Sequence, residues 1–393
     1  MATNFIPYGR QTIDQDDIDA VVSALTSSHL TQGPKVTAFE QAIANKVKAA
    51  HAVAVNSATS ALHLACLALG VTQDDWVWTS PNTFIASANC ARYCGANVDF
   101  VDIDPDTYNL CPKQLANKLA QAKQQNRLPK VVIPVHFAGQ SCDMKAIHEL
   151  SQEYGFYIIE DASHAIGGRY QDSYIGDCRY SDICVFSFHP VKIITTGEGG
   201  MATTQSARHA KHMRTHAQQG TSKDAEDLIT QPGDWYYEQH TLGFNYRMTE
   251  LQAALGLSQL NKLDDFIAKR HTAFAYYLET LKKLPITLPA QATDSNSALH
   301  LFPILIPKEH KKARKAIFDA LRSAGIGTQV HYIPVHTQPY YQDLGFDWGD
   351  FPIAEDYYQR TMSLPLFYEI TRSEQERVVS ILTQALQEHG VLS

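Results

Sequence analysis

The stretch Ile183-Cys-Val-Phe-Ser-Phe-His-Pro-Val-Lys-Ile-Ile-Thr-Thr-Gly-Glu-Gly-Gly200 decides how the rest of this chain is interpreted. It begins with a largely apolar run, Ile183–Phe188, of the kind found in strands that are buried between layers of helices. Lys192 follows this run and enters a loop rich in threonine and glycine. Removal of a lysine from water lowers its pKa, and the neutral amine is a nucleophile toward an aldehyde. Lys192 is therefore the first candidate for a catalytic residue.

Similar apolar runs, separated by helical segments, occur on both sides of this stretch. They are Ala52–Val55, Val77–Thr79, Val98–Val101, Val131–Val135 and Phe156–Ile159, and a further strand, Gly200–Thr204, is expected directly after the glycine-rich turn. This alternation predicts an α/β fold with a mainly parallel sheet. Because ligands of such sheets bind beyond the carboxyl ends of the strands, the residues that follow each run are candidates for a site.

The length of 393 residues suits two domains. We expect a large domain over residues 1–249, with an N-terminal helical arm, and a small α/β domain over residues 250–393. The small domain is expected to start with a helical tract that runs to about Leu284. Its further expected elements are a strand Leu299–Ile306, a helix Lys308–Ala324, a strand Thr328–Tyr332 and a final helix Ser373–Glu388.

Composition excludes several classes of protein. The formal net charge is -8 and no run is rich in lysine and arginine, which disfavours nucleic acid as a partner. No apolar stretch is long enough to span a bilayer, and the N-terminus does not resemble a signal peptide. Seven cysteines without framework spacing suit a reducing cytoplasm. No metal is expected, because the helical histidines His209, His212 and His216 have no nearby cysteine or carboxylate to complete a site.

The segment Asn56-Ser-Ala-Thr-Ser60 lies between a strand and a helix. Free backbone N–H groups, hydroxyls and the positive end of the helix dipole favour a phosphate at such a place. An ordinary helix N-cap is the alternative. Ser187, at the end of its own strand, could add a hydroxyl to the same phosphate.

Two further side chains follow buried strands. Asp161 needs a cationic partner if it is buried, and a protonated pyridine nitrogen would serve and keep the ring an electron sink. The alternative is an aspartate that caps the next turn, and the sequence leaves both interpretations open. Phe84 could stack on a flat cofactor or belong to the core.

Four ordered motifs resemble the DegT/DnrJ/EryC1/StrS sugar aminotransferases over nearly the whole chain. They are Asn56-Ser-Ala-Thr-Ser-Ala-Leu-His-Leu64, Glu160-Asp-Ala-Ser-His-Ala165, Ser187-Phe-His-Pro-Val-Lys-Ile-Ile-Thr-Thr-Gly-Glu-Gly-Gly200 and Gly243-Phe-Asn-Tyr-Arg-Met-Thr-Glu250. The resemblance implies the type I aminotransferase fold with a smaller C-terminal domain. It also implies pyridoxal 5'-phosphate (PLP) as cofactor and a homodimer with shared active sites.

The resemblance also implies a role for each matching residue. Lys192 corresponds to the lysine that holds the cofactor covalently and moves the proton during transfer. Asp161 is implied to pair with the ring nitrogen, Phe84 to stack on the ring, and His164 to lie on or near it. The implied phosphate contacts are Ala58, Thr59, Ser187 and, from the other subunit, Asn245.

Within the family, the chain is most similar to members that act on nucleotide sugars in pseudaminic acid biosynthesis. The reaction implied moves an amino group from L-glutamate, through the pyridoxamine form of the cofactor (PMP), to C4 of a UDP-4-keto-6-deoxy-N-acetyl sugar. The product would be UDP-4-amino-4,6-dideoxy-N-acetyl-β-L-altrosamine. The implied substrate contacts are Tyr8, Ser28, His29, Leu30, Thr31, Ala58, Arg247, Gln329, Val330, His331 and Tyr332.

Three other functions fit parts of the same sequence. Another nucleotide-sugar aminotransferase would differ in the sugar's stereochemistry, in the carbon that is aminated or in the nucleotide. Related dehydratases carry histidine in place of the lysine, so Lys192 disfavours them. A non-catalytic regulator of the same fold would not need Lys192, Asp161 and the phosphate segment together.

Overall fold

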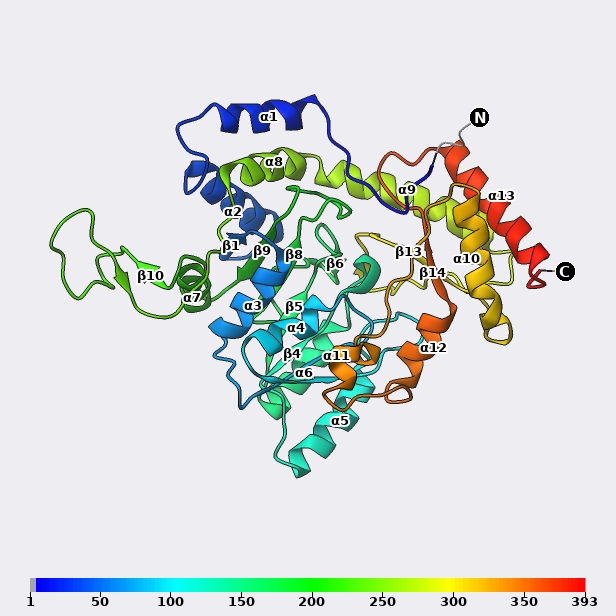
Figure 1. The fold of residues 1–393 in the computed structure, drawn as a ribbon, viewed down its shortest axis with the longest axis horizontal. Helices are drawn as coiled ribbons and strands as arrows, with labels where there is room; N and C mark the ends of the chain where they lie inside the picture. The colour runs from blue at the N-terminus through cyan, green and yellow to red at the C-terminus, as the bar shows by residue number, and fades with distance from the viewer. Residues whose placement is uncertain (1–4, 393) are drawn as a thin grey trace.

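The centre of the molecule is a seven-stranded sheet surrounded by helices (Figure 1). The computed structural model describes residues 5–392. Across the sheet the strands follow the order β1 (His51–Val55), β9 (Gly200–Thr204), β8 (Ile183–Ser187), β5 (Tyr157–Asp161), β4 (Val131–Ile133), β2 (Trp76–Thr79) and β3 (Asn97–Phe100). β9 is antiparallel to both of its neighbours, whereas the other neighbouring pairs are parallel. The predicted α/β fold with a mainly parallel sheet is confirmed.

Helices cover both faces of the sheet, and the alternation of side chains along each strand assigns them to a face. The covering helices are α2 (Pro34–Val47), α3 (Ala58–Ala68), α4 (Ala86–Tyr93), α5 (Pro112–Gln124), α6 (Met144–Tyr154), α7 (Ala207–Ala217) and α8 (Glu250–Asn261). Val53 and Val55 of β1 pack into one cluster with residues of α3, α4 and α7, whereas Ala52 and Ala54 pack into another with residues of α2 and α8. At the other end of the sheet, Val132 of β4 packs with residues of α5 and α6.

The helical tract expected after residue 249 is two helices. α8 starts with a capping box formed by Thr249 and Gln252 and ends before Lys262, and α9 (Leu263–Leu281) continues beyond it. The Lys262 ammonium forms ion pairs with Asp14 and Asp17, at the start of α1 (Gln15–Leu25). The break in the tract therefore ties α1 to α8, which lie side by side in Figure 1.

The C-terminal part has its own apolar core, built around a two-stranded antiparallel sheet. The prediction of a strand at Thr328–Tyr332 is wrong, because this segment makes only a single bridge, between Gln329 and Ser363. The elements here are β13 (Phe302–Leu305), β14 (Thr361–Leu364), a 3-10 helix (Lys308–Ala313), α10 (Arg314–Ser323), α11 (Pro339–Gln342), α12 (Pro352–Arg360) and α13 (Arg372–Glu388). Small strands elsewhere are β6 (Arg169–Tyr170), β7 (Ser173–Tyr174) and β12 (Ser295–Asn296).

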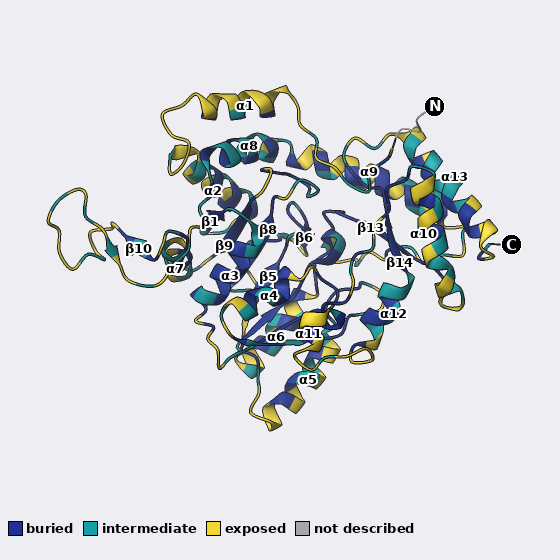
Figure 2. Cartoon of the chain, in the orientation of Figure 1, coloured by how far each residue is buried: buried dark blue, intermediate teal, exposed yellow. Residues whose placement is uncertain are grey.

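A hairpin after α7 extends away from the rest of the molecule (Figures 1 and 2). Its base is the strand pair β10 (Thr221–Ser222) and β11 (Glu238–Gln239), and the residues between these strands form a loop. Large apolar side chains on this arm are solvent-exposed: Ile229 is 86%, Trp235 75% and Tyr237 57% exposed. Such exposed apolar groups on a projecting segment are typical of a surface that contacts another protein.

Within residues 5–392, no helix combines the length and the apolar character that a membrane span requires.

Candidate active site

A cavity of about 680 Å³ opens where β1, β5 and β8 end, and this volume suits a small-molecule site. These strands point in the same direction, so their carboxyl ends meet at one edge of the sheet. Ten of the residues singled out from the sequence line the cavity: Tyr8, Ala58, Thr59, Phe84, Asp161, His164, Ser187, Lys192, His331 and Tyr332.

The segment after β1 brings the N-terminus of α3 (Ala58–Ala68) to the cavity. Ser57 caps α3, since its hydroxyl accepts the backbone N–H of Ser60 at 3.1 Å. The backbone N–H groups of Ala58 and Thr59 follow, at the positive end of the helix dipole and on the cavity wall. A β-carbon at Gly200 would lie 2.5 Å from the Ala58 nitrogen, so the missing side chain allows β9 to approach this turn. The segment is an N-cap that also lines the cavity, and its contact with a phosphate stays a prediction.

Asp161 ends β5 and is 4% exposed. Its Oδ2 accepts a hydrogen bond from the Ser87 hydroxyl at 2.6 Å. Its Oδ1 accepts from the Ser163 hydroxyl at 2.6 Å and from the Ser163 backbone N–H at 3.1 Å. The second bond caps the following turn, as the alternative interpretation required, yet the carboxylate also lines the cavity. These neutral donors stabilise the ionised form and leave room for a cationic partner.

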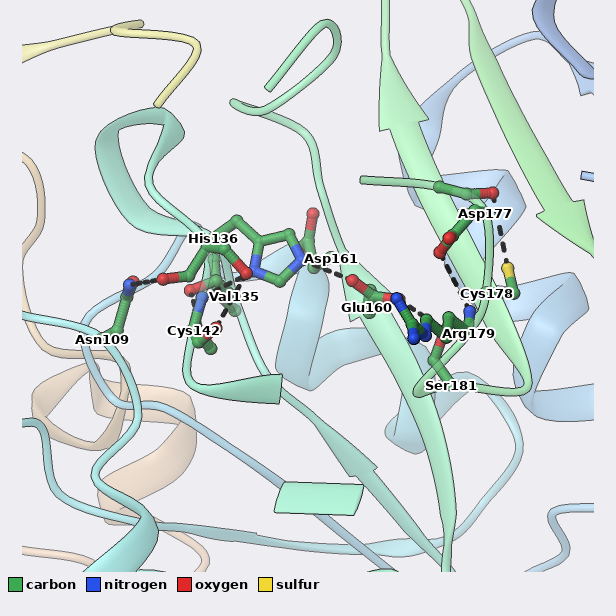
Figure 3. A network of polar contacts seen from close by, with 12 residues as sticks. Asn109, Val135, His136, Cys142, Glu160, Asp161, Asp177, Cys178, Arg179 and Ser181 are labelled. Carbon is green, nitrogen blue, oxygen red and sulfur yellow. Dashed lines mark hydrogen bonds and ion pairs between the residues drawn. The ribbon is translucent and has the colours of Figure 1, made fainter. Parts of the chain in front are cut away.

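A second network of buried hydrogen bonds, around His136 and Glu160, holds the end of β5 in place (Figure 3). His136 donates its backbone N–H to the Asp161 carbonyl at 3.0 Å. Its Nδ1 accepts the backbone N–H of Cys142, so Nε2 carries the proton that binds Glu160 Oε2 at 2.7 Å. The Ser181 hydroxyl donates to the other Glu160 oxygen at 2.5 Å. The backbone of β5 is therefore fixed where Asp161 enters the cavity.

Lys192 lies in the loop after β8 and shares the cavity with Asp161. Among the residues described, none forms a hydrogen bond or an ion pair with its ammonium group. Burial lowers the pKa of Lys192 to about 8, and the charge of Asp161 opposes part of this shift. A substantial fraction of the amine is consequently neutral near physiological pH, which is the state that attacks an aldehyde.

Two aromatic groups border the same space. Phe84 is 58% exposed and lines the cavity, which contradicts its assignment to the core. The Tyr332 hydroxyl and Nε2 of His164 form a hydrogen bond of 3.0 Å, and the two rings are stacked at an angle of 21°. The exposed face of Phe84 is available to a planar ligand.

Three imidazoles near Lys192 are held neutral. Burial, with the nearby positive charge of Lys192, lowers the pKa of His331 to about 3 and that of His164 well below its usual value. His300 was missed by the sequence analysis, because it comes from a distant segment and carries no motif; its ring centre is 4.4 Å from that of His164, and burial lowers its pKa too. Nδ1 of His164 and Nδ1 of His300 are buried without a hydrogen-bond partner in the described structure.

The other residues singled out from the sequence lie away from this cavity. Arg247 borders a different cavity, together with Gln32 and Arg214. No arginine is among the described residues that line the first cavity. The remaining predicted contacts outside it are the exposed Ser28, His29, Leu30, Thr31, Asn245 and Gln329 and the half-buried Val330. Their roles stay predictions, and within one chain these side chains do not meet Lys192.

The donor set of the cavity matches a flat, anionic aldehyde that carries a basic ring nitrogen. Lys192 offers an amine, Asp161 a buried carboxylate and the start of α3 an anion cradle. The sequence pattern of the DegT/DnrJ/EryC1/StrS aminotransferase family matches residues 11–383. The chain belongs to the DegT/DnrJ/EryC1/StrS aminotransferase family.

Relatives of known sequence cover almost the full length of this aminotransferase. The spore coat polysaccharide biosynthesis protein SpsC of Bacillus subtilis is 40% identical over 382 residues, 96% of each chain. The UDP-4-amino-4,6-dideoxy-N-acetyl-beta-L-altrosamine transaminase of Campylobacter jejuni is 36% identical over 388 residues, 97% of this chain and 98% of the relative. The expected membership in the family is thus confirmed.

Solved structures of other family members share the fold. Helicobacter pylori PseC, an aminotransferase involved in pseudaminic acid biosynthesis, superposes with a TM-score of 0.89 at 29% identity and covers 98% of this chain and 100% of its own. The putative sugar aminotransferase Spr1654 of Streptococcus pneumoniae reaches 0.90 at 28% identity in its PMP form, with the same coverage. In its PLP form it reaches 0.89 at 27% identity, over 99% of this chain and 100% of its own. The type I aminotransferase fold is confirmed, and these two forms agree with the predicted cofactor.

Proposed function

We propose that this aminotransferase binds PLP on Lys192 and moves an amino group from L-glutamate to C4 of a UDP-4-keto-6-deoxy-N-acetyl sugar in the cytoplasm. The observation that carries the proposal is the placement of Lys192, with a pKa of about 8, in one cavity with Asp161 and the start of α3. The names of the Campylobacter and Helicobacter relatives support the pseudaminic acid precursor as product. The Bacillus relative supports a sugar substrate of another polysaccharide pathway, which is the second candidate.

Each residue of the cavity has a distinct task in this reaction. When bound, PLP supplies an electron sink for the carbon that bears the transferred nitrogen. The neutral Lys192 amine would accept a proton from that carbon, and the resulting ammonium would deliver it to the cofactor carbon within the same half of the reaction. In the second half Lys192 would move a proton the opposite way, from the cofactor carbon to C4 of the sugar. Asp161 would keep the ring nitrogen protonated, while the N–H groups of Ala58 and Thr59 would bind the phosphate. Phe84 would cover one face of the ring, and the neutral His164 would add no charge that competes with Asp161.

The pKa of Lys192 predicts how pH controls cofactor loading. In the apoenzyme, the rate of PLP incorporation should rise as pH rises and level off above about 8, because only the neutral amine attacks the aldehyde. Stopped-flow absorbance over a pH series measures this rate, with Lys192→Ala as the background. Since the charge of Asp161 raises the lysine pKa, the midpoint should move to lower pH in Asp161→Asn. A rate that is flat across this range, or an unmoved midpoint in the variant, would contradict the assignment.

We further propose a homodimer in which each cavity is completed by the other copy. The described lining of the cavity contains no arginine for the negative groups of a nucleotide sugar, while Arg247 and Asn245 lie elsewhere on the chain. The exposed apolar side chains of the β10–β11 arm support contact with a second copy. This arrangement would bring Arg247 and Asn245 of one copy to the Lys192 of the other.

Sharing of sites predicts complementation between inactive variants. Lys192→Ala and Arg247→Ala should each be inactive as homodimers, but co-expression should restore activity, because one site of the heterodimer then has an intact Lys192 and an intact Arg247. Asp161→Asn is the matched control: combined with Lys192→Ala it should restore nothing, since both residues belong to the same cavity of one chain. Turnover of tandem-purified heterodimers measures both. Equal results for the two pairings would argue against sharing.

Product identification separates the candidate substrates. The enzyme should convert a UDP-4-keto-6-deoxy-N-acetylhexosamine of the L-arabino configuration, in the presence of glutamate, to an amino sugar that mass spectrometry and NMR identify. The D-xylo isomer and a 3-keto sugar are the matched comparisons. Preference for either comparison compound would reassign the substrate while leaving the aminotransferase activity in place.

A further inference from the structure

The turn between β2 and α4 carries one side chain that lines the cavity and one that is buried behind it against Asp161. Phe84 is exposed to the cavity, whereas Ser87, three residues later in the first turn of α4, is fully buried. The Ser87 hydroxyl also approaches the Phe84 carbonyl at 3.4 Å. One short segment therefore both lines the cavity, through Phe84, and hydrogen-bonds the carboxylate of Asp161, through Ser87.

The hydrogen bonds of this segment have a fixed direction. An ionised carboxylate only accepts, so the Ser87 hydroxyl donates its hydrogen to Asp161 Oδ2 at 2.6 Å. Thr83 Oγ1 lies 2.8 Å from Ser87 Oγ, and because the Ser87 hydrogen is already committed, Thr83 is the donor of that bond. Both side chains are buried. The result is a chain of donors, Thr83 to Ser87 to Asp161, that ends on the carboxylate.

The two carboxylate oxygens depend on their serines to different degrees. Oδ1 receives both the hydroxyl and the backbone N–H of Ser163, so loss of that hydroxyl leaves one donor in place. Oδ2 receives Ser87 alone among the hydrogen bonds of the described residues. Loss of the Ser87 hydroxyl would leave this oxygen buried without a donor, which is costly for a charged group.

We propose that Ser87 is a positioning residue that orients the Asp161 carboxylate so that it can accept the proton of the cofactor's ring nitrogen. The inference rests on the proposed cofactor, since Ser87 acts through Asp161 and touches no reacting atom. Its hydroxyl favours the ionised carboxylate, which in turn keeps the ring nitrogen protonated. The Ser163 hydroxyl makes a similar bond to the other oxygen, but there the backbone N–H of Ser163 donates as well.

The test compares Ser87→Ala with Ser163→Ala in the holoenzyme. The primary readout is the ¹⁵N chemical shift of ring-labelled PLP, which reports protonation of the ring nitrogen without any turnover. Ser87→Ala should move this shift toward the unprotonated value, and kcat should fall about 10- to 100-fold with KM nearly unchanged, because a hydrogen bond to a charged group is lost. Ser163→Ala should change both readouts much less.

Two further variants distinguish positioning from a general loss of packing. Thr83→Val keeps the shape but removes the donor to Ser87, so it should move the ¹⁵N shift in the same direction by a smaller amount. Ser87→Cys, a weak donor of similar shape, should fall between wild type and Ser87→Ala. A wild-type ¹⁵N shift in Ser87→Ala, whatever its melting temperature, would overturn the proposal. Failure of wild-type enzyme to bind labelled PLP would instead overturn the proposed function.

Discussion

Lys192→Ala should fold normally, and its turnover of the sugar substrate should fall by about ten-thousand-fold or more. The side chain has no hydrogen bond or ion pair with the described residues that would be left unsatisfied, so the folded state loses little. Catalysis loses both the amine that holds the cofactor and the group that moves the proton. Burial lowers the lysine pKa to about 8 in the native protein, and alanine has no comparable base to offer.

Steady-state assays with glutamate and the keto sugar measure the loss, and absorbance spectra show whether the lysine-bound cofactor forms. Lys192→Arg tests the chemistry more closely, because the guanidinium keeps the positive charge but does not become neutral in proteins. It should be as inactive as the alanine variant. Lys46→Ala, which removes a surface ion pair with Asp264, is the control that should keep full activity. Retention of turnover and of the lysine-bound spectrum in Lys192→Ala would remove the basis of the proposed function.

The features predicted most accurately from the sequence are those that depend on one continuous segment of the chain. Buried apolar runs identified the strands of the central sheet, and the rule for parallel sheets then brought Lys192 and Asp161 to one edge before any contact was known. The expected strand at Thr328–Tyr332 failed for the opposite reason, since its pairing depends on a distant partner that offers only one bridge, at Ser363.

The residues that the sequence analysis missed come from distant segments. His300 reaches His164 from the C-terminal part, and Ser87 reaches Asp161 from the start of α4. Neither lies in a motif, and a serine near a helix start predicts only a cap. Periodicity and strand ends thus identify the groups at the sheet edge, whereas the side chains that orient those groups depend on tertiary packing.

Asp161→Asn should fold and bind the phosphate of the cofactor but lose about a hundred- to ten-thousand-fold in kcat. The amide has nearly the same shape, so it retains an oxygen that can accept from Ser87 or Ser163, but its NH₂ group must then face the other donor. More important, a neutral amide does not stabilise a proton on the ring nitrogen. The ring then withdraws electrons less strongly, and the carbanionic step slows.

Steady-state kinetics and the ¹⁵N shift of labelled PLP test this together, since the kcat loss and the loss of ring protonation should have one cause. Asp182→Asn is the matched control, because Asp182 is also a partly buried carboxylate and accepts the backbone N–H of Ile158 at 2.8 Å, away from the cavity. It should lower the melting temperature while leaving kcat and the ¹⁵N shift near wild type. If Asp161→Asn kept a protonated ring nitrogen and a kcat within about twofold of wild type, another group would have to hold that proton. Neither His164 nor His331 is suited to hold that proton on the ring nitrogen. Burial lowers the pKa of both, and a neutral imidazole has no negative charge to stabilise a protonated ring nitrogen.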